Sequence, residues 1–160
     1  MLFVCLGSIC RSPTAEGVLK HLLATVSPPL PIEVDSAGTE SYHIGAPPDV
    51  RSQRAALRRG IRIADLRARR VELDDFAQFD LILATDRSNL RDLEALRPAD
   101  SRAEVRLFLE YAGGNHDGGG RASLDVPDPY LGDESGFEHV LDLVTEASRK
   151  LLEKLQQRAQ

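Results

Sequence analysis

The feature that most constrains the fold is an apolar run that passes through a turn into a proline. Residues 1–4 are continuously apolar, which is typical of a short buried strand. Ser12 and Pro13 predict a helix start, with Ser12 as the N-cap and Pro13 at the first helical position, where the missing N–H costs nothing. The chain from Cys5 to Arg11 must therefore curl from the strand into the helix.

This curled segment predicts an anion site, because a backbone that turns towards a helix N-terminus directs several N–H groups at one point. Arg11 can hold two phosphate oxygens through its planar guanidinium. Cys5 is the natural nucleophile, since a thiol that faces a helix N-terminus and a guanidinium is ionised near neutral pH. Ser12 can donate its hydroxyl to that sulfur. The plain alternative is a structural cysteine buried at a strand end.

The loop resembles a known family. The phosphate-binding loop of the low-molecular-weight protein tyrosine phosphatases is similar to Cys5-Leu6-Gly7-Ser8-Ile9-Cys10-Arg11-Ser12-Pro13, and their general-acid motif is similar to Asp128-Pro129-Tyr130. Further segments follow in the family's order: Asp35-Ser36-Ala37-Gly38-Thr39, Gly45-Ala46-Pro47-Pro48-Asp49, Asp75-Phe76, Asp80 and Asp86-Arg87-Ser88-Asn89-Leu90. The resemblance implies a single domain over residues 1–160, with an α/β fold. Its central four-stranded parallel sheet has helices on both faces and the first strand in the middle.

The resemblance also implies a reaction. A protein tyrosine phosphatase of this kind forms a cysteinyl-phosphate: Cys5 attacks phosphorus, Arg11 binds the phosphate, and Asp128 protonates the leaving oxygen and then deprotonates water. Because Asp128 must start protonated, we expect a bell-shaped rate profile with an acidic optimum. Further phosphate- or substrate-binding positions are expected at Leu6, Gly7, Ser8, Ile9, Cys10, Ser12, Ser36 and Tyr130.

Cys10 has a second expected role. The resemblance implies that oxidised Cys5 is trapped as a Cys5–Cys10 disulfide and so spared irreversible oxidation. The alternative is a small buried apolar side chain.

Three positions depart from the family pattern. Ser8 stands where asparagine is usual, Leu131 where many members have a second tyrosine, and Leu66 where some have histidine. Asparagine tolerates a left-handed backbone, so Ser8 is expected to leave the loop less rigid. These changes bear on substrate preference and leave the catalytic set intact.

Other functions share parts of this pattern. Protein arginine phosphatases have threonines in the loop, whereas Leu6 and Ile9 give this loop an apolar rim suited to an aromatic ring, with Tyr130 available for stacking. Arsenate reductases of this type relay a disulfide through later cysteines, and none follows Cys10. A non-catalytic phosphopeptide-binding module has no use for a thiol beside Arg11.

Composition narrows the partners. A net charge of −5 disfavours nucleic-acid binding. No apolar run approaches the length of a membrane span, and no basic leader precedes the first strand, so we expect a cytoplasmic protein. Two cysteines in one loop predict neither a disulfide framework nor a zinc site, and no cofactor is expected. The expected partners are tyrosine-phosphorylated proteins and a cognate tyrosine kinase, with the chain as a monomer or weak dimer.

The remaining chain alternates strand and helix signals, as in a parallel sheet covered on both faces. Helices are expected near residues 13–25, 49–59, 74–78, 86–97 and from 136 onward, strands at 32–35, 81–84 and 105–109, a turn at 36–39, and a mobile glycine-rich loop at 112–123. An arginine-rich stretch is interpreted as a solvated face, and the alternative is a docking patch for acidic partners. Its members are Arg51, Arg54, Arg58, Arg59, Arg62, Arg67, Arg69 and Arg70.

Overall fold

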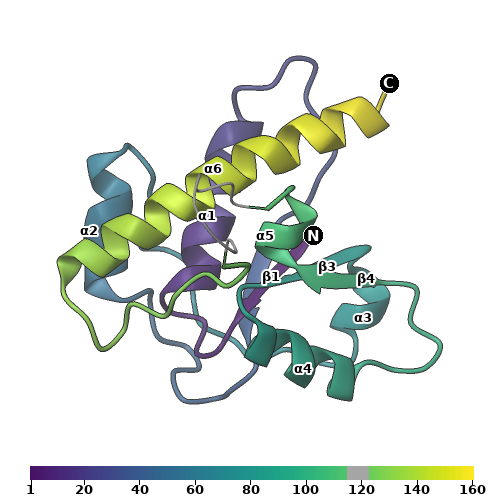
Figure 1. The fold of residues 1–160 in the computed structure, drawn as a ribbon, viewed down its shortest axis with the longest axis horizontal. Coiled ribbons are helices and arrows are strands. Elements are labelled where there is room, and N and C mark those ends of the chain that lie inside the picture. The colour runs from purple at the N-terminus through teal and green to yellow at the C-terminus, as the bar shows by residue number, and fades with distance from the viewer. Residues whose placement is uncertain (115–122) are drawn as a thin grey trace.

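The centre of the protein is a parallel sheet. The computed structural model describes residues 1–114 and 123–160. Its four strands lie in the order β2-β1-β3-β4 (Figure 1). They are β1 (Leu2–Cys5), β2 (Asp35–Gly38), β3 (Leu81–Ala84) and β4 (Glu104–Leu107), and every pairing is parallel. The expected α/β fold, with the first strand inside the sheet, is confirmed.

The strands β1 and β3 are covered on both faces, which explains their continuous apolar sequences. Leu2 pairs with Ile82 and Phe3 with Leu83. Because successive side chains point to opposite faces, Phe3 and Leu83 join one apolar cluster while Leu2 and Ile82 join the other. The two clusters form the core on either side of the sheet.

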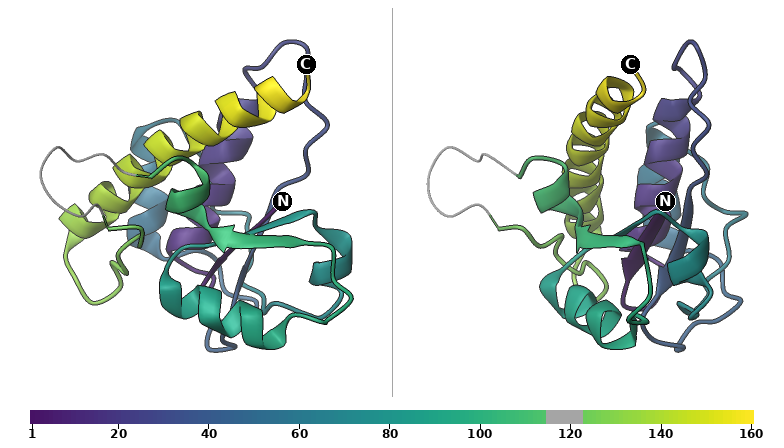
Figure 2. Two further views of the ribbon diagram at one scale, coloured as in Figure 1. Left: turned by 45° about the vertical axis from the view of Figure 1, so that its right-hand side comes forward. Right: turned by 90° about the vertical axis from the view of Figure 1, so that its right-hand side faces the viewer.

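Helices cover both faces. On one side lie α1 (Arg11–Leu23), α2 (Val50–Arg58), α5 (Phe108–Tyr111) and α6 (Glu134–Arg158), and α3 (Asp75–Gln78) and α4 (Arg87–Leu96) pack on the other. The helices α1 and α6 pack against each other and stand side by side in the right-hand view of Figure 2. Among the described residues, each helix is too short or too polar to cross a membrane.

The second strand differs from its prediction. It runs over Asp35–Gly38, and the segment expected to be a turn is therefore part of the sheet. Pairing with β1 decides this, since Asp35 lies opposite Leu2 and Gly38 opposite Cys5. Gly38 is needed because the backbone of the loop packs closely against it, not because it has unusual dihedral angles. A Cβ at this position would lie 2.6 Å from the Leu6 carbonyl oxygen.

The first helix also begins earlier than predicted. It starts at Arg11, the N-cap position is Cys10, and no side chain caps it. Ser12 is therefore not the cap, and its hydroxyl is available to Cys5. The uncapped helix end leaves its backbone N–H groups facing the loop.

The later helices begin at polar caps. Asp49 accepts a hydrogen bond from the Arg51 amide at the start of α2, and Asp86 caps α4. Asp133 caps α6, which begins at Glu134, two residues before the predicted start. Gly60, with a φ of 76°, follows the end of α2 as predicted. The expected strand near residue 105 is confirmed and runs directly into α5. Most of the predicted loop at 112–123 lies outside the described residues.

Candidate active site

The loop between β1 and α1 lies at the carboxyl end of β1, the edge where open parallel sheets carry their sites. Ser8 has a φ of 60°, and within the described residues no other non-glycine residue has a positive φ. The neighbours hold this conformation: the Arg69 amide donates to Ser8 Oγ at 3.5 Å, and the Asp49 amide donates to the Ile9 carbonyl at 2.8 Å. The loop is thus fixed from two sides.

The thiol of Cys5 is buried at the base of the loop. Its Sγ lies 3.2 Å from Ser12 Oγ, which lies 3.2 Å from the Ala37 carbonyl oxygen. Ser12 has one hydroxyl proton, so it donates either to the carbonyl or to the sulfur. A Cys5 thiolate turns that proton towards sulfur, and Ser12 then stabilises the anion.

The guanidinium of Arg11 is 3% exposed and faces two carboxylates. One Nη lies 2.5 Å from Asp86 Oδ2 and 3.1 Å from the Val126 carbonyl oxygen, and the other lies 3.6 Å from Asp128 Oδ2. Burial disfavours the charged guanidinium, but the negative charges of Cys5 and Asp86 outweigh it and raise the pKa of Arg11. Arg11 is therefore a fixed cation beside the thiol.

The segment that carries Asp128 is anchored on the sheet. The buried Val126 donates its N–H to the Thr85 carbonyl at 2.8 Å, and Asp125 accepts from the Arg87 amide at 2.9 Å. The Asp128 side chain is 46% exposed and accepts from the Tyr130 amide at 3.1 Å. It projects from this anchored segment towards Arg11.

These groups meet in a pocket of about 220 Å³. Eight predicted site residues line it: Cys5, Leu6, Gly7, Ile9, Cys10, Arg11, Asp128 and Tyr130. Tyr42 and His43 complete the wall of the pocket, and the sequence analysis does not predict them. The signal that could have indicated them is the presence of two adjacent aromatic rings in the loop after β2.

The three remaining predicted positions lie behind the pocket wall. Ser8 and Ser12 are buried below the loop. Ser36 is also buried, and its hydroxyl donates to the Glu16 carboxylate. Of the departures from the family pattern, Leu66 packs against the core, while Leu131 is 95% exposed beside Tyr130.

The second cysteine of the loop, Cys10, holds its proton more tightly than a free thiol does. Burial, and then the charge of Asp49, raise the pKa of Cys10 to about 12. Cys10 is therefore a neutral thiol at physiological pH, which fits a small apolar wall residue.

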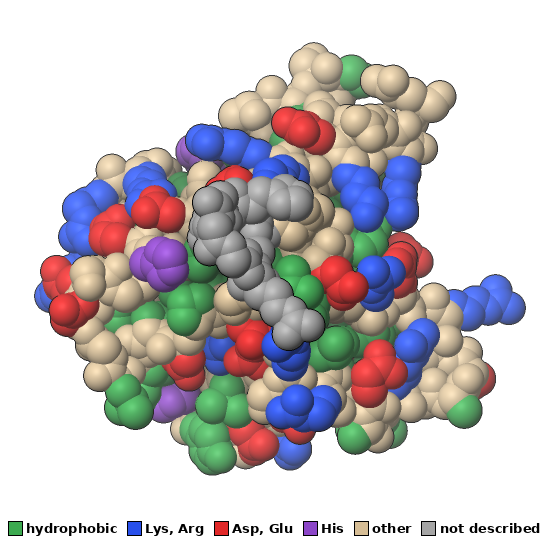
Figure 3. Space-filling model, in the orientation of Figure 1, with side chains coloured by type: hydrophobic (Ala, Val, Ile, Leu, Met, Phe, Trp, Pro, Cys, Tyr) green, Lys and Arg blue, Asp and Glu red, His purple; other side chains and the backbone are tan. Residues whose placement is uncertain are grey.

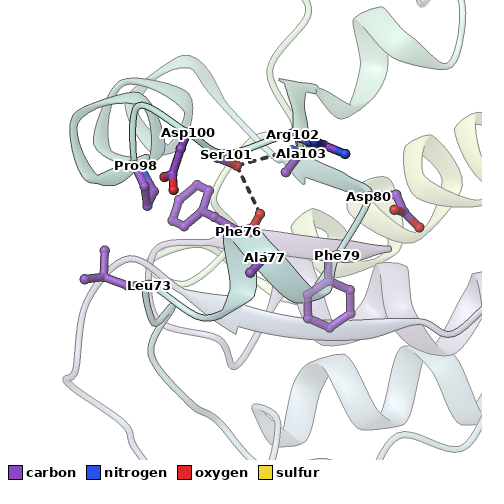
Figure 4. Close-up of a pocket in the computed structure, with 10 residues that line it drawn as sticks. All are labelled: Leu73, Phe76, Ala77, Phe79, Asp80, Pro98, Asp100, Ser101, Arg102 and Ala103. Carbon is purple, nitrogen blue, oxygen red and sulfur yellow. Dashed lines mark hydrogen bonds between the residues drawn. The ribbon is translucent and has the colours of Figure 1, made fainter.

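A larger hollow of about 340 Å³ lies at the opposite end of the sheet (Figure 4). Its wall comes from α3 and the segments that precede β3 and β4, including Phe76, Phe79 and Ala103. Ser101 donates its hydroxyl to the Phe76 carbonyl and accepts from the Ala103 amide. Its described lining contains neither cysteine nor histidine, so the pocket around Cys5 remains the candidate site.

The arginine-rich stretch is largely ion-paired. Arg58 lies 2.6 Å from Glu138, and Arg59 lies 2.9 Å from Glu138 and 2.6 Å from Asp142. Basic and acidic side chains also stand next to one another on the face drawn in Figure 3. These pairs support the interpretation as a solvated face, because an acidic partner would have to displace them.

The fold and the site define a class of protein: α/β proteins in which a loop with a buried cysteine and a buried arginine links the first strand to the first helix. The sequence profile described as "Low molecular weight phosphotyrosine protein phosphatase" matches residues 1–160. The chain belongs to this family.

Individual relatives cover nearly the whole chain. A Synechocystis sp. protein whose name places it in the same family is 44% identical over 156 residues, which are 97% of this chain and 95% of the relative. The crystal structure of a protein tyrosine phosphatase from Entamoeba histolytica has a TM-score of 0.87 at 35% identity and covers 99% of this chain and 97% of its own. The structure of DARP, a Drosophila arginine phosphatase, has a TM-score of 0.84 at 32% identity, with 96% of each chain covered.

Proposed function

We propose that the protein is a single phosphatase domain over residues 1–160 that hydrolyses phosphotyrosine and other aryl phosphate monoesters. The observation that carries this proposal is the convergence of Cys5, Arg11 and Asp128 on one pocket. A nucleophile, a fixed cation and an acid are the parts that a two-step phosphoryl transfer requires.

In the first step, the Cys5 thiolate attacks phosphorus and the P–O bond to the leaving alcohol breaks. Arg11 and the loop N–H groups hold the phosphate oxygens, and Ser12 stabilises the thiolate as a leaving group for the next step. Asp128 donates its proton to the leaving oxygen. In the second step, Asp128 removes a proton from water, which hydrolyses the cysteinyl-phosphate.

The proposed substrate class follows from the pocket wall. Leu6, Ile9 and Tyr130 supply apolar and aromatic surface above the phosphate site, and His43 lies with its ring 6.1 Å from that of Tyr130. An aromatic ring between such side chains gains burial and stacking. We therefore expect tyrosine-phosphorylated proteins, a cognate tyrosine kinase among them, as partners.

The family also contains proteins with another named activity, since DARP is described as an arginine phosphatase. That observation makes phosphoarginine the second candidate. A threonine hydroxyl could accept from a guanidinium, whereas the aliphatic Ile9 side chain cannot, which favours phosphotyrosine here.

The test is phosphate release from two peptides that differ only in phosphotyrosine or phosphoarginine, measured from pH 5 to 8. Cys5→Ser is the blank, because it keeps the loop but removes the thiolate. Release from phosphotyrosine by the parent and none by the blank is the expected result. Preference for phosphoarginine would overturn the substrate assignment while leaving the nucleophile in place. Binding of phosphopeptide without release by the parent would instead make the protein a non-catalytic binding module.

A further inference from the structure

Arg51, in the first turn of α2, bridges Asp49 and the segment that follows Asp128. Its Nη2 donates to the Tyr130 carbonyl oxygen at 2.9 Å, and its Nη1 to the Gly132 carbonyl oxygen at 3.2 Å. Its guanidinium carbon lies 4.4 Å from the Phe137 ring centroid and 5.8 Å from that of Tyr130. One side chain thus holds the turn that directly follows Asp128.

The same side chain is fixed from the other direction by Asp49. Arg51 Nε and Nη2 donate to the two carboxylate oxygens at 3.0 and 2.9 Å, and these hydrogen bonds lower the pKa of Asp49. The Asp49 amide in turn donates to the carbonyl oxygen of Ile9 in the phosphate-binding loop. A continuous chain of hydrogen bonds therefore runs from the phosphate-binding loop, through Asp49 and Arg51, to the turn that follows Asp128.

We propose that Arg51 is a positioning residue, which sets the Asp128 carboxyl at its working distance from the phosphate site. The Pro129–Gly132 turn is closed by one hydrogen bond of its own, from the Gly132 amide to the Pro129 carbonyl. Arg51 supplies two hydrogen bonds that join this turn to the start of α2. Placement matters because misplacing a catalytic group by about 1 Å can cost about 10²-fold in rate.

This proposal rests on the proposed role of Asp128, and it predicts which substrates are affected. Phenyl phosphate needs a proton on its leaving oxygen, whereas 2,4-dinitrophenyl phosphate releases a stable phenolate without one. The value of kcat/KM reports on the first chemical step. In Arg51→Gln we expect kcat/KM for phenyl phosphate to fall by about 10- to 100-fold, with little change for the dinitrophenyl ester.

A double substitution separates positioning from general damage to the fold. If Arg51 acts through Asp128, adding Arg51→Gln to Asp128→Asn causes no further loss. The matched control is Arg54→Gln on the same helix, since Arg54 also reaches towards α6 and lies 3.4 Å from Glu134. It should keep the parental kcat/KM for both substrates. Arg51→Lys, which keeps the charge but not the planar fork, should show a loss for phenyl phosphate only.

A second readout does not depend on activity. Hydrogen exchange at the Gly132 amide should be faster in Arg51→Gln than in the parent and in Arg54→Gln, because the turn loses its link to α2. Equal loss for both esters, an additive effect with Asp128→Asn, or unchanged exchange would each overturn the proposal. Failure of the parent to hydrolyse either ester would refute the proposed function, while the exchange experiment would still test the link.

Discussion

Replacing Asp86 with asparagine removes a charge from the site while keeping a side chain of the same shape. Asp86 Oδ2 accepts from Arg11 at 2.5 Å, and its Oδ1 accepts from the Asn89 amide at 2.8 Å, where it caps α4. Asparagine also caps helices well, so Asp86→Asn affects mainly the pairing with Arg11. Asp86→Ala removes the pairing and the cap together.

The size of the effect follows from burial. Removing one partner of a buried ion pair costs about 3–5 kcal/mol, because the remaining charge is left uncompensated. The Arg11 side chain is 3% exposed but that of Asp86 is 21% exposed, and Arg11 keeps the Val126 carbonyl as an acceptor. We therefore expect the free energy of unfolding to fall by about 2–3 kcal/mol in Asp86→Asn. Asp86→Ala should lose about 1 kcal/mol more, the usual value of a helix cap.

Urea unfolding followed by circular dichroism measures both variants, with Asp92→Asn, an exposed position on the same helix, as the control. Saturating phosphate should reduce the stability deficit of Asp86→Asn, because the bound anion replaces the negative charge that Asp86 placed beside Arg11. A deficit below about 1 kcal/mol, as for an exposed pair, would refute the reasoning about burial. A deficit of equal size with and without phosphate would show that Arg11 does not face the anion.

Three further substitutions test other parts of the site. Gly38→Ala places a Cβ 2.6 Å from the Leu6 carbonyl oxygen, so unfolding experiments should show a loss of about 1–3 kcal/mol together with lower kcat/KM. Asp128→Asn should lower kcat/KM for phenyl phosphate by about 10²–10⁴. An unchanged kcat/KM in Asp128→Asn would assign the acid role to another group. After peroxide, we expect the Cys5 sulfenic acid to condense with the Cys10 thiol and release water, so Cys10→Ser should recover less activity on reduction than the parent, and equal recovery would exclude the disulfide.

Much of the fold could be predicted because local signals and tertiary packing agree. The apolar run at residues 81–84 can be covered on both faces only inside a sheet, and Asp86 and Gly60 mark helix ends by backbone chemistry that acts within a few residues. The second strand is predicted at residues 32–35, too early in the chain, because here local signals and tertiary packing disagree. Its residues, Asp-Ser-Ala-Gly, carry no strand signal, and pairing with β1 makes Asp35–Gly38 a strand.

The sequence by itself indicated the loop chemistry of the candidate site, since Cys5, Arg11 and the helix start are neighbours along the chain, whereas the structure showed that the helix start is uncapped. The family resemblance also predicts the acid role of Asp128, which two prolines frame. Only the tertiary structure decided the long-range partners: Asp86 beside Arg11, Tyr42 and His43 in the wall, and Arg51 across from Tyr130. These contacts join segments far apart in sequence, and a charge or ring carries no local sign of which distant group it will face once the helices pack on the sheet.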